Sequence, residues 1–284
     1  MNNKIILITG VSSGIGFATA DFYLQQGCKV IGLYHREKDG DFFREKYAQN
    51  FIGLQIDVTD FTKVDQIPEI LKKHGINHVD GLVNNAGVAL AGPLEYQKFS
   101  EIQSMLQVNV VAVIKMTQVI LPLLKKAEQG RIVNISSVSG KNGTPFLGVY
   151  CASKHAIEGF SETLRRELNL YGMKVSIVGP GSVNTPIWNK GINVVANAFD
   201  STEYKNSFAK FIAFVNAEIE HALPVEIVVQ DIHHALTNAK PKFRYAPVPR
   251  KFQNWYLPKL FPLKIYDYLM CKTLGLNKNL TKNI

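Results

Sequence analysis

The chain has 284 residues and a formal net charge of +9 at pH 7; 46% of its residues are hydrophobic, so it can bury an ordinary core and global disorder is excluded. Its three cysteines, Cys28, Cys151 and Cys271, lie far apart, which excludes a disulfide framework and favours a reducing, cytoplasmic compartment. The seven histidines show no metal-ligand spacing, so we expect no metal.

The positive charge is concentrated at the C-terminus. From position 240 onward ten residues are basic and only Asp267 is acidic, which leaves 22 basic and 22 acidic residues in 1–239. We therefore divide the chain into a neutral main domain, 1–239, and a basic, aromatic C-terminal extension, 240–284. No RNA- or DNA-binding motif accompanies the charge, so no nucleic-acid partner is expected.

Strand-like and helix-like segments alternate along the first 180 residues. The short apolar runs that predict strands are 4–9, 29–34, 51–56, 79–84, 131–136 and 174–179. Longer amphipathic stretches separate them, and this alternation predicts right-handed βαβ units whose strands are covered on both faces. The predicted fold is α/β: a Rossmann-like, doubly wound parallel sheet in a single domain with a C-terminal extension. After Pro186 the alternation stops, until Pro224 predicts a further helix and 242–247 a last strand.

The first predicted strand runs into a glycine-rich turn, Thr9-Gly10-Val11-Ser12-Ser13-Gly14-Ile15-Gly16, which opens a helix. Such a turn lets backbone N–H groups approach a pyrophosphate, and the positive end of the helix dipole favours its charge. The spacing is GxxxGxG rather than GxGxxG, so on its own it is also compatible with a tight turn that binds no ligand.

Polar motifs follow the later predicted strands as well. They are Asn84-Asn85-Ala86-Gly87, Ser137, Tyr150-Cys151-Ala152-Ser153-Lys154 and Pro180-Gly181-Ser182-Val183-Asn184-Thr185. Open α/β sheets bind ligands at the carboxyl ends of their parallel strands, so we expect these motifs to form one site with the glycine turn.

In these motifs, which stand in order over residues 4–186, the chain resembles the classical short-chain dehydrogenase/reductase family. The segment 186–223, the Lys242-Phe243-Arg244-Tyr245 run and the long C-terminus resemble, more loosely, its hydroxysteroid and retinol dehydrogenase branch. The resemblance implies an enzyme that interconverts a carbonyl and an alcohol by hydride transfer with a nicotinamide cofactor. It also implies a homo-oligomer.

The expected cofactor-binding residues surround the glycine turn and the strand ends. They are Gly10, Ser12, Ser13, Gly14, Ile15, Gly16, His35, Arg36, Asp57, Asn84, Ala86, Tyr150, Lys154, Pro180, Gly181, Val183 and Thr185. In family terms Asp57 contacts the adenine, and Asn84 with Ala86 flanks the adenosine ribose. Thr185 holds the nicotinamide amide.

The end of the second predicted strand bears on the choice of cofactor. By the family's spacing an NAD-specific acid would stand at Tyr34, and without it a ribose 2′-phosphate meets no repulsion. Arg36 can bind that phosphate bidentately, with His35 and Ser13 assisting. This favours NADP(H) over NAD(H); the alternative is that Arg36 is only a solvated surface residue.

Tyr150 and Lys154 are spaced i, i+4 on a predicted helix and so share one face. A cation ~5 Å from a phenolate stabilises it by roughly 3 kcal/mol, which predicts a pKa for Tyr150 lowered from ~10 towards neutrality. Ser137 would hydrogen-bond the substrate oxygen. The resemblance adds Asn109, which holds a water for proton relay, and completes the catalytic group Asn109, Ser137, Tyr150 and Lys154. Taken singly, the tyrosine could be a packing residue, the serine a strand end and Asn109 a support for the loop at Asn84.

The apolar character of 186–223 indicates a hydrophobic substrate, because the resemblance makes this segment the mobile cover of the substrate site. A steroid, a retinoid or another lipid-like carbonyl compound fits that description, with Tyr150 as the acid/base. The same segment could instead bury Phe208, Phe211, Ile212 and Val215 as an ordinary helix face. Two alternatives remain: a 3-oxoacyl-thioester reductase, and a non-catalytic dinucleotide-binding regulator, which would need a broken catalytic group.

Aromatic residues and cations interleave throughout 240–284. This pattern predicts an interfacial segment that lies on an anionic membrane and admits a lipid-soluble substrate from it. The alternative is that the aromatic residues cover the protein's own pocket mouth or a subunit contact.

Overall fold

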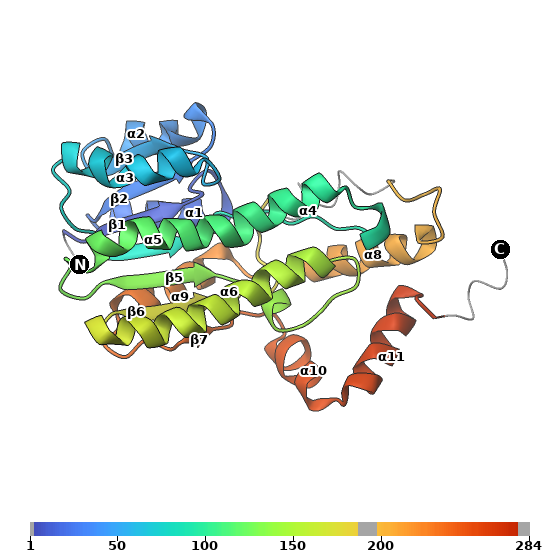
Figure 1. Cartoon of the computed structure of the whole chain (residues 1–284). Helices are drawn as coiled ribbons and strands as arrows, with labels where there is room; N and C mark the ends of the chain where they lie inside the picture. Colours follow the sequence, from blue (N-terminus) through green and yellow to red (C-terminus); the bar gives the residue numbers. More distant parts are fainter. Residues whose placement is uncertain (1–2, 187–197, 278–284) are drawn as a thin grey trace.

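The computed structural model describes residues 3–186 and 198–277, with one parallel sheet at the centre (Figure 1). Its strands are β1 (Ile5–Thr9), β2 (Lys29–Tyr34), β3 (Phe51–Gln55), β4 (Gly81–Asn84), β5 (Arg131–Ile135), β6 (Lys174–Val178) and β7 (Arg244–Tyr245). They are arranged in the order β3-β2-β1-β4-β5-β6-β7, and each neighbouring pair is parallel. The predicted doubly wound α/β fold is confirmed, including a short last strand within 242–247.

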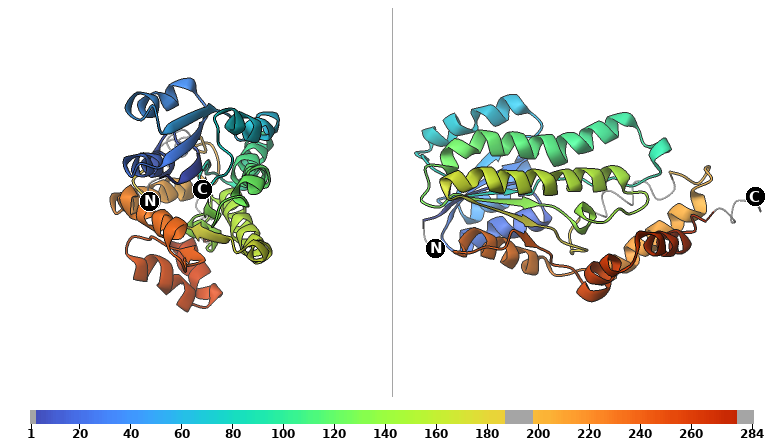
Figure 2. Two further views of the ribbon diagram at one scale, coloured as in Figure 1. Left: turned by 90° about the vertical axis from the view of Figure 1, so that its left-hand side faces the viewer. Right: turned by 60° about the horizontal axis from the view of Figure 1, so that its bottom comes forward.

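Helices cover both faces of the sheet, as Figure 2 shows. They are α1 (Gly14–Gln25), α2 (Asp41–Lys46), α3 (Phe61–Lys73), α5 (Ala112–Leu124), α6 (Gly148–Glu167) and α9 (Val225–Thr237). The alternation of strand side chains divides the core: Ile6 and Ile8 pack with α1, α2 and α9, whereas Leu7 packs with α3, α5 and α6. Both faces of the strands are therefore buried, as their apolar runs indicated.

The helix α4 (Phe99–Leu106) continues through a π-helical turn, Gln107–Val111, into α5. By length and composition alone this stretch could cross a membrane, with a mean hydropathy of 1.6. Its α5 part instead buries Met116, Ile120 and Leu124 in the core, and a core helix passes the same test. The stretch is therefore weak support for a membrane span.

The C-terminal part departs from the regular layers, except for α9 and β7, which belong to them. Its other elements are α8 (Lys205–Glu220), a π-helical turn (Phe252–Tyr256), α10 (Leu257–Leu260) and α11 (Leu263–Leu274). Figure 1 shows α10 and α11 projecting from the body, and α11 packs on α8. Of the segment 186–223, residues 187–197 lie outside the described residues.

A third apolar cluster joins α8 and α11 to the start of α6. It contains Phe146, Tyr150, Phe199, Phe208, Phe211, Val215 and Leu274 among its buried members. Ile212 is only partly buried against it. The helix-face interpretation of Phe208, Phe211 and Val215 is thus confirmed, and the same face places a largely aromatic cluster around Tyr150.

Candidate active site

A cavity of about 560 Å³ opens at the carboxyl ends of the strands. Most of the expected site residues line it: Gly10, Ser12, Ser13, Gly14, Ile15, His35, Arg36, Asp57, Ala86, Ser137, Tyr150, Lys154, Pro180, Gly181, Val183 and Thr185. The structure therefore brings together residues from seven separate chain segments. Gly16, Asn84 and Asn109 are not among the described lining residues.

The glycine turn is shaped for a close approach of backbone to ligand. Gly10 and Gly14 adopt φ of +72° and +61°, where other residues are strained. A Cβ at Gly16 would lie 2.2 Å from the carbonyl oxygen of Gly10, so Gly16 closes the turn rather than lining the cavity. The first turn of α1 contains no acidic residue, and its N-cap Ser13 makes no side-chain cap bond with any described residue. These N–H groups fit a dinucleotide pyrophosphate.

The expectation for Asn84 requires a correction. Its side chain is 2% exposed, and its amide nitrogen donates to Thr117 Oγ1 at 3.1 Å and Asn134 Oδ1 at 2.8 Å. The side chain of Asn84 therefore ties β4 to β5 and α5, and it does not line the cavity. The neighbouring Asn85 lines the cavity, and its amide nitrogen donates to the carbonyl oxygen of Gly10 at 3.1 Å.

Acidic residues accompany both expected phosphate ligands at the end of β2. Arg36 Nη2 lies 2.8 Å from Asp39 Oδ1, and Arg36 Nε donates to Asp39 Oδ2 at 3.2 Å. His35 Nε2 lies 3.5 Å from Asp57 Oδ2. Asp39 lines the cavity too, and sequence reasoning missed it, although its i, i+3 spacing from Arg36 was a usable signal. Tyr34, at the position of the family's acid, is buried.

Tyr150, Lys154 and Ser137 meet at the other end of the cavity. Lys154 Nζ lies 5.7 Å from the centroid of the Tyr150 ring, on the same face of α6. Lys154 also donates to the carbonyl oxygen of Ile135 at 3.0 Å. The side chain of Ser137 hydrogen-bonds Tyr150. The tyrosine and lysine are 5% and 6% exposed, so both are removed from bulk water.

Burial dominates the pKa values of this pair, which corrects the expectation for Tyr150. Burial raises the pKa of Tyr150 to about 12, although the hydrogen bond with Ser137 acts in the opposite direction. Burial also lowers the pKa of Lys154 to about 8. With its pKa raised in this way, Tyr150 is protonated at neutral pH.

Asn109 lies in the π-helical turn, and its side chain supports the loop after β4. Its Oδ1 accepts from the backbone N–H of Val88 at 2.9 Å, and its Nδ2 donates to the carbonyl oxygen of Val88 at 2.8 Å and to Ser153 Oγ at 3.0 Å. A Cβ at Gly87, in the same loop, would lie 3.7 Å from Lys154 Nζ. The structure thus gives the Asn109 side chain the loop-supporting role that the sequence left open as an alternative.

This fold and this site define a dinucleotide-binding α/β oxidoreductase. A family model described as short chain dehydrogenase matches residues 4–193. The chain therefore belongs to the short-chain dehydrogenase/reductase family, and it is an oxidoreductase that acts on an alcohol or carbonyl group.

Several characterised relatives resemble the chain over most of its length. The NADPH-dependent 3-dehydrocapnine reductase of Ornithobacterium rhinotracheale is 38% identical, over 95% of this chain and 97% of that protein. The 3-ketodihydrosphingosine reductase of Bacteroides thetaiotaomicron is 33% identical, over 86% and 87%. Retinol dehydrogenase 16 of Rattus norvegicus is 33% identical, over 95% and 88%, which confirms the resemblance to the retinol and hydroxysteroid branch.

The likeness extends to solved structures. A short-chain dehydrogenase from Streptomyces avermitilis has a TM-score of 0.76 with this chain at 26% identity, and the match covers 100% of this chain and 99% of that one. The alignment thus spans the C-terminal extension as well as the sheet.

Proposed function

We propose that the protein reduces the ketone of a hydrophobic substrate with NADPH and that Tyr150 donates the proton. The observation that carries this proposal is the meeting of Tyr150, Ser137 and Lys154 in the cavity that the glycine turn also lines. NADPH, when bound, supplies a hydride to the carbonyl carbon. The Tyr150 hydroxyl gives its proton to the carbonyl oxygen, to which Ser137 donates a hydrogen bond as negative charge develops.

Lys154 completes the proton chemistry. Its cation stabilises the phenolate left after proton transfer, and the ribose hydroxyls of the nicotinamide half are its expected ligands. A proton from solvent then restores the phenol. Because the pKa of Tyr150 is raised to about 12, the residue holds a proton at neutral pH and serves reduction better than alcohol oxidation.

The surroundings of Tyr150 support a long apolar substrate. Phe146, Phe199, Phe208 and Phe211 belong to the same buried cluster as Tyr150, so the proposed proton donor has apolar neighbours, although none of the four phenylalanines lines the cavity. Two relatives are named as reductases of 3-dehydrocapnine and of 3-ketodihydrosphingosine, a long-chain amino ketone. We therefore place long-chain ketones of this kind first, ahead of steroid and retinoid carbonyls.

A substrate panel tests this function. The purified enzyme is mixed with NADPH and, in separate reactions, with 3-dehydrocapnine, 3-ketodihydrosphingosine, all-trans-retinal, a ketosteroid and an acetoacetyl thioester. We expect the fastest loss of NADPH absorbance with one of the two long-chain ketones. Preference for the thioester would instead support the 3-oxoacyl-thioester reductase alternative, and no turnover of any compound by enzyme that binds NADPH would contradict the proposal.

Arg36 is proposed to select NADPH by binding the 2′-phosphate, while the Nε and Nη2 atoms of its guanidinium stay paired with Asp39. Arg36→Ala should raise the KM for NADPH by about 10- to 100-fold, since a hydrogen bond to a charged group contributes about 1.5–3 kcal/mol. The KM for NADH should stay unchanged, because NADH has no phosphate there. Steady-state kinetics with both cofactors measure this, and an equal loss for the two cofactors would contradict the assignment.

The C-terminal extension is proposed to contact an anionic membrane surface while the enzyme remains cytoplasmic. One face of α11 packs Met270 and Leu274 into the cluster that contains Tyr150. The opposite face leaves Ile265, Tyr268 and Leu269 exposed, at 46%, 58% and 44%. Lysines flank this face, so it combines apolar side chains with the positive charge that anionic headgroups attract.

Vesicle sedimentation tests the membrane contact. The double variant I265S/L269S should lose about 10-fold or more of its partition into vesicles that contain phosphatidylserine, because two apolar side chains no longer enter the interface. Leu170→Ser is the matched control: Leu170 is 80% exposed but lies outside the extension. Equal binding by all three proteins, or binding to neutral phosphatidylcholine alone, would contradict the proposal.

A homo-oligomer is proposed on the basis of the family and of the exposed face of the α4–α5 stretch. Phe99, Val111 and Ile114 on this stretch are 70%, 41% and 42% exposed. Exposed apolar side chains along one helical stretch are typical of a surface that pairs with another subunit. Analytical ultracentrifugation of the full chain measures the oligomeric state.

A further inference from the structure

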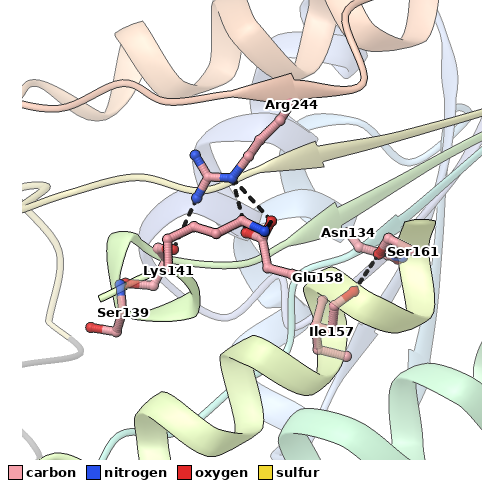
Figure 3. Close-up of polar contacts among 8 residues, drawn as sticks. Asn134, Ser139, Lys141, Ile157, Glu158, Ser161 and Arg244 are labelled. Atoms are coloured by element: carbon pink, nitrogen blue, oxygen red, sulfur yellow. Dashed lines mark hydrogen bonds and ion pairs between the residues drawn. The ribbon is translucent and has the colours of Figure 1, made fainter. Parts of the chain in front are cut away.

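The guanidinium of Arg244 on β7 is held by groups from the catalytic part of the chain (Figure 3). Its Nε donates to both carboxylate oxygens of Glu158, at 3.0 and 3.1 Å. Its Nη2 donates to the carbonyl oxygen of Ser137 at 3.1 Å. Lys141 Nζ lies 3.4 Å from the same carboxylate, so Glu158 is paired with two cations.

Two glycines beside this ion pair leave the space that it occupies. The side chains of Glu158 and Arg244 are 4% and 14% exposed. A Cβ at Gly179, where β6 ends, would lie 2.3 Å from Arg244 Nη2, so only glycine leaves room for the guanidinium. A Cβ at Gly140 would lie 3.0 Å from Glu158 Cγ. The pair is therefore packed in one arrangement, not spread over a solvated surface.

Arg244 joins the two elements that carry the proposed proton chemistry. Ser137 follows β5, while Glu158 lies on α6 at i+4 from Lys154 and i+8 from Tyr150, on the same helix face. The carbonyl oxygen of Ser137 has two donors, the backbone N–H of Gly140 at 3.0 Å and the Arg244 guanidinium. Fixing this carbonyl fixes the backbone from which the Ser137 hydroxyl reaches Tyr150.

A later residue of the C-terminal extension, to which Arg244 itself belongs, contacts the same guanidinium. Arg244 Cζ lies 4.4 Å from the centroid of the Trp255 ring, and Trp255 is only 8% exposed. Arg244 Nη1 is buried and has no hydrogen-bond partner within residues 3–186 and 198–277. The π face of the indole compensates for that missing bond, because a desolvated cation is attracted to an aromatic ring.

We infer that Arg244 is a positioning residue that aligns Ser137 with Tyr150 and that Trp255 holds Arg244 in place. Through this contact the C-terminal extension contributes to catalysis without touching the substrate. The inference rests on the proposed roles of Ser137 and Tyr150. Loss of the contact should lower kcat and leave cofactor binding intact, because Arg244 does not line the cavity.

The test uses a variant that removes the contact without leaving a buried charge unpaired. The double variant R244M/E158M replaces both charges by apolar side chains of similar length, which a fold commonly tolerates. Its kcat should fall by about 10- to 100-fold, the effect of a misplaced catalytic group, with the KM for NADPH unchanged. Trp255→Leu should lower kcat by about 2- to 5-fold, as expected for one lost cation–π contact. Lys141→Ala, which touches Glu158 but not Ser137, is the control and should keep its kcat.

The pH profile separates positioning from a merely structural role. In the direction of alcohol oxidation Tyr150 must be deprotonated, so the rate rises with pH through its pKa. The hydrogen bond with Ser137 lowers that pKa, so R244M/E158M should move the midpoint of the rise to higher pH. A variant that only destabilised the fold would lower the active fraction and leave the midpoint unmoved.

Hydrogen exchange gives a readout that needs no substrate. The backbone N–H groups of Ser139 and Gly140 donate to the Oγ and carbonyl oxygen of Ser137, so both should exchange faster in R244M/E158M. Exchange in the glycine turn, residues 10–16, should stay as in the wild type. Unchanged exchange at Ser139 and Gly140, or faster exchange with kcat and pH midpoint unchanged, would overturn the inference. Should the wild type reduce none of the panel ketones, the proposed function fails, while exchange still decides whether Arg244 holds Ser137.

Discussion

Tyr150→Phe is expected to lower kcat by about 10²- to 10⁴-fold, the contribution of a positioned general acid. The ring and its packing in the aromatic cluster are kept, and only the hydroxyl that we propose as the proton donor is lost. The Kd for NADPH, measured by fluorescence titration, should remain close to the wild-type value, because the glycine turn and the end of β2 are untouched.

A matched control isolates the hydroxyl from its surroundings. Tyr204→Phe removes the hydroxyl of another tyrosine that packs on the same cluster, and its kcat should stay near the wild-type value. If Tyr150→Phe reduced ketones at the wild-type rate, another group would be the proton donor. A parallel loss of NADPH binding would mean that Tyr150 serves the cofactor site.

Lys154→Met is expected to remove turnover and yet stabilise the fold at neutral pH. Burial lowers the pKa of Lys154 from 10.5 to about 8, so the folded protein holds the charged lysine at a cost of up to about 3 kcal/mol. Methionine has a similar length and no charge, so the variant does not carry this cost. It also loses the hydrogen bond to the carbonyl oxygen of Ile135, which offsets part of the gain in stability. Urea unfolding at neutral pH should show a higher midpoint.

The gain in folding stability from Lys154→Met should depend on pH. The unfolded chain binds more protons than the folded one between about pH 8 and 10.5, so the lysine's penalty shrinks as the pH rises through that window. The gain from Lys154→Met should therefore be largest below pH 8 and vanish towards pH 10.5. A variant that is less stable than the wild type at neutral pH would show that Lys154 is a structural ion and not a strained functional one.

The sheet and most of the cavity could be predicted because local signals determine them. Apolar runs locate the strands, and the carboxyl ends of parallel strands must share an edge, so motifs such as Asn84–Gly87 and Ser137 had to converge. Which of two adjacent asparagines faces the cavity depends on the strand register, which the sequence does not display. Asn84 therefore turned out to join β4 to Asn134, and Asn85 faces the cavity.

Burial and distant pairing account for what the sequence could not show. The spacing of Tyr150 and Lys154 indicates their proximity, but the desolvation that raises the pKa of Tyr150 comes from surrounding side chains of the folded chain. The contact of Arg244 with Ser137 joins positions 107 residues apart, and no local pattern records it. Asp39, by contrast, stands close enough to Arg36 for its helical-turn spacing to have indicated the ion pair.

The account depends most on Tyr150 acting on a carbonyl beside the bound nicotinamide, and a crystal structure of the complex with NADP⁺ and the product alcohol tests this directly. The alcohol oxygen should lie about 2.6–3.2 Å from both the Tyr150 and the Ser137 hydroxyls, with the nicotinamide ring next to Thr185. An alcohol oxygen bound away from Tyr150, or a dinucleotide whose nicotinamide lies outside the cavity, would contradict the account.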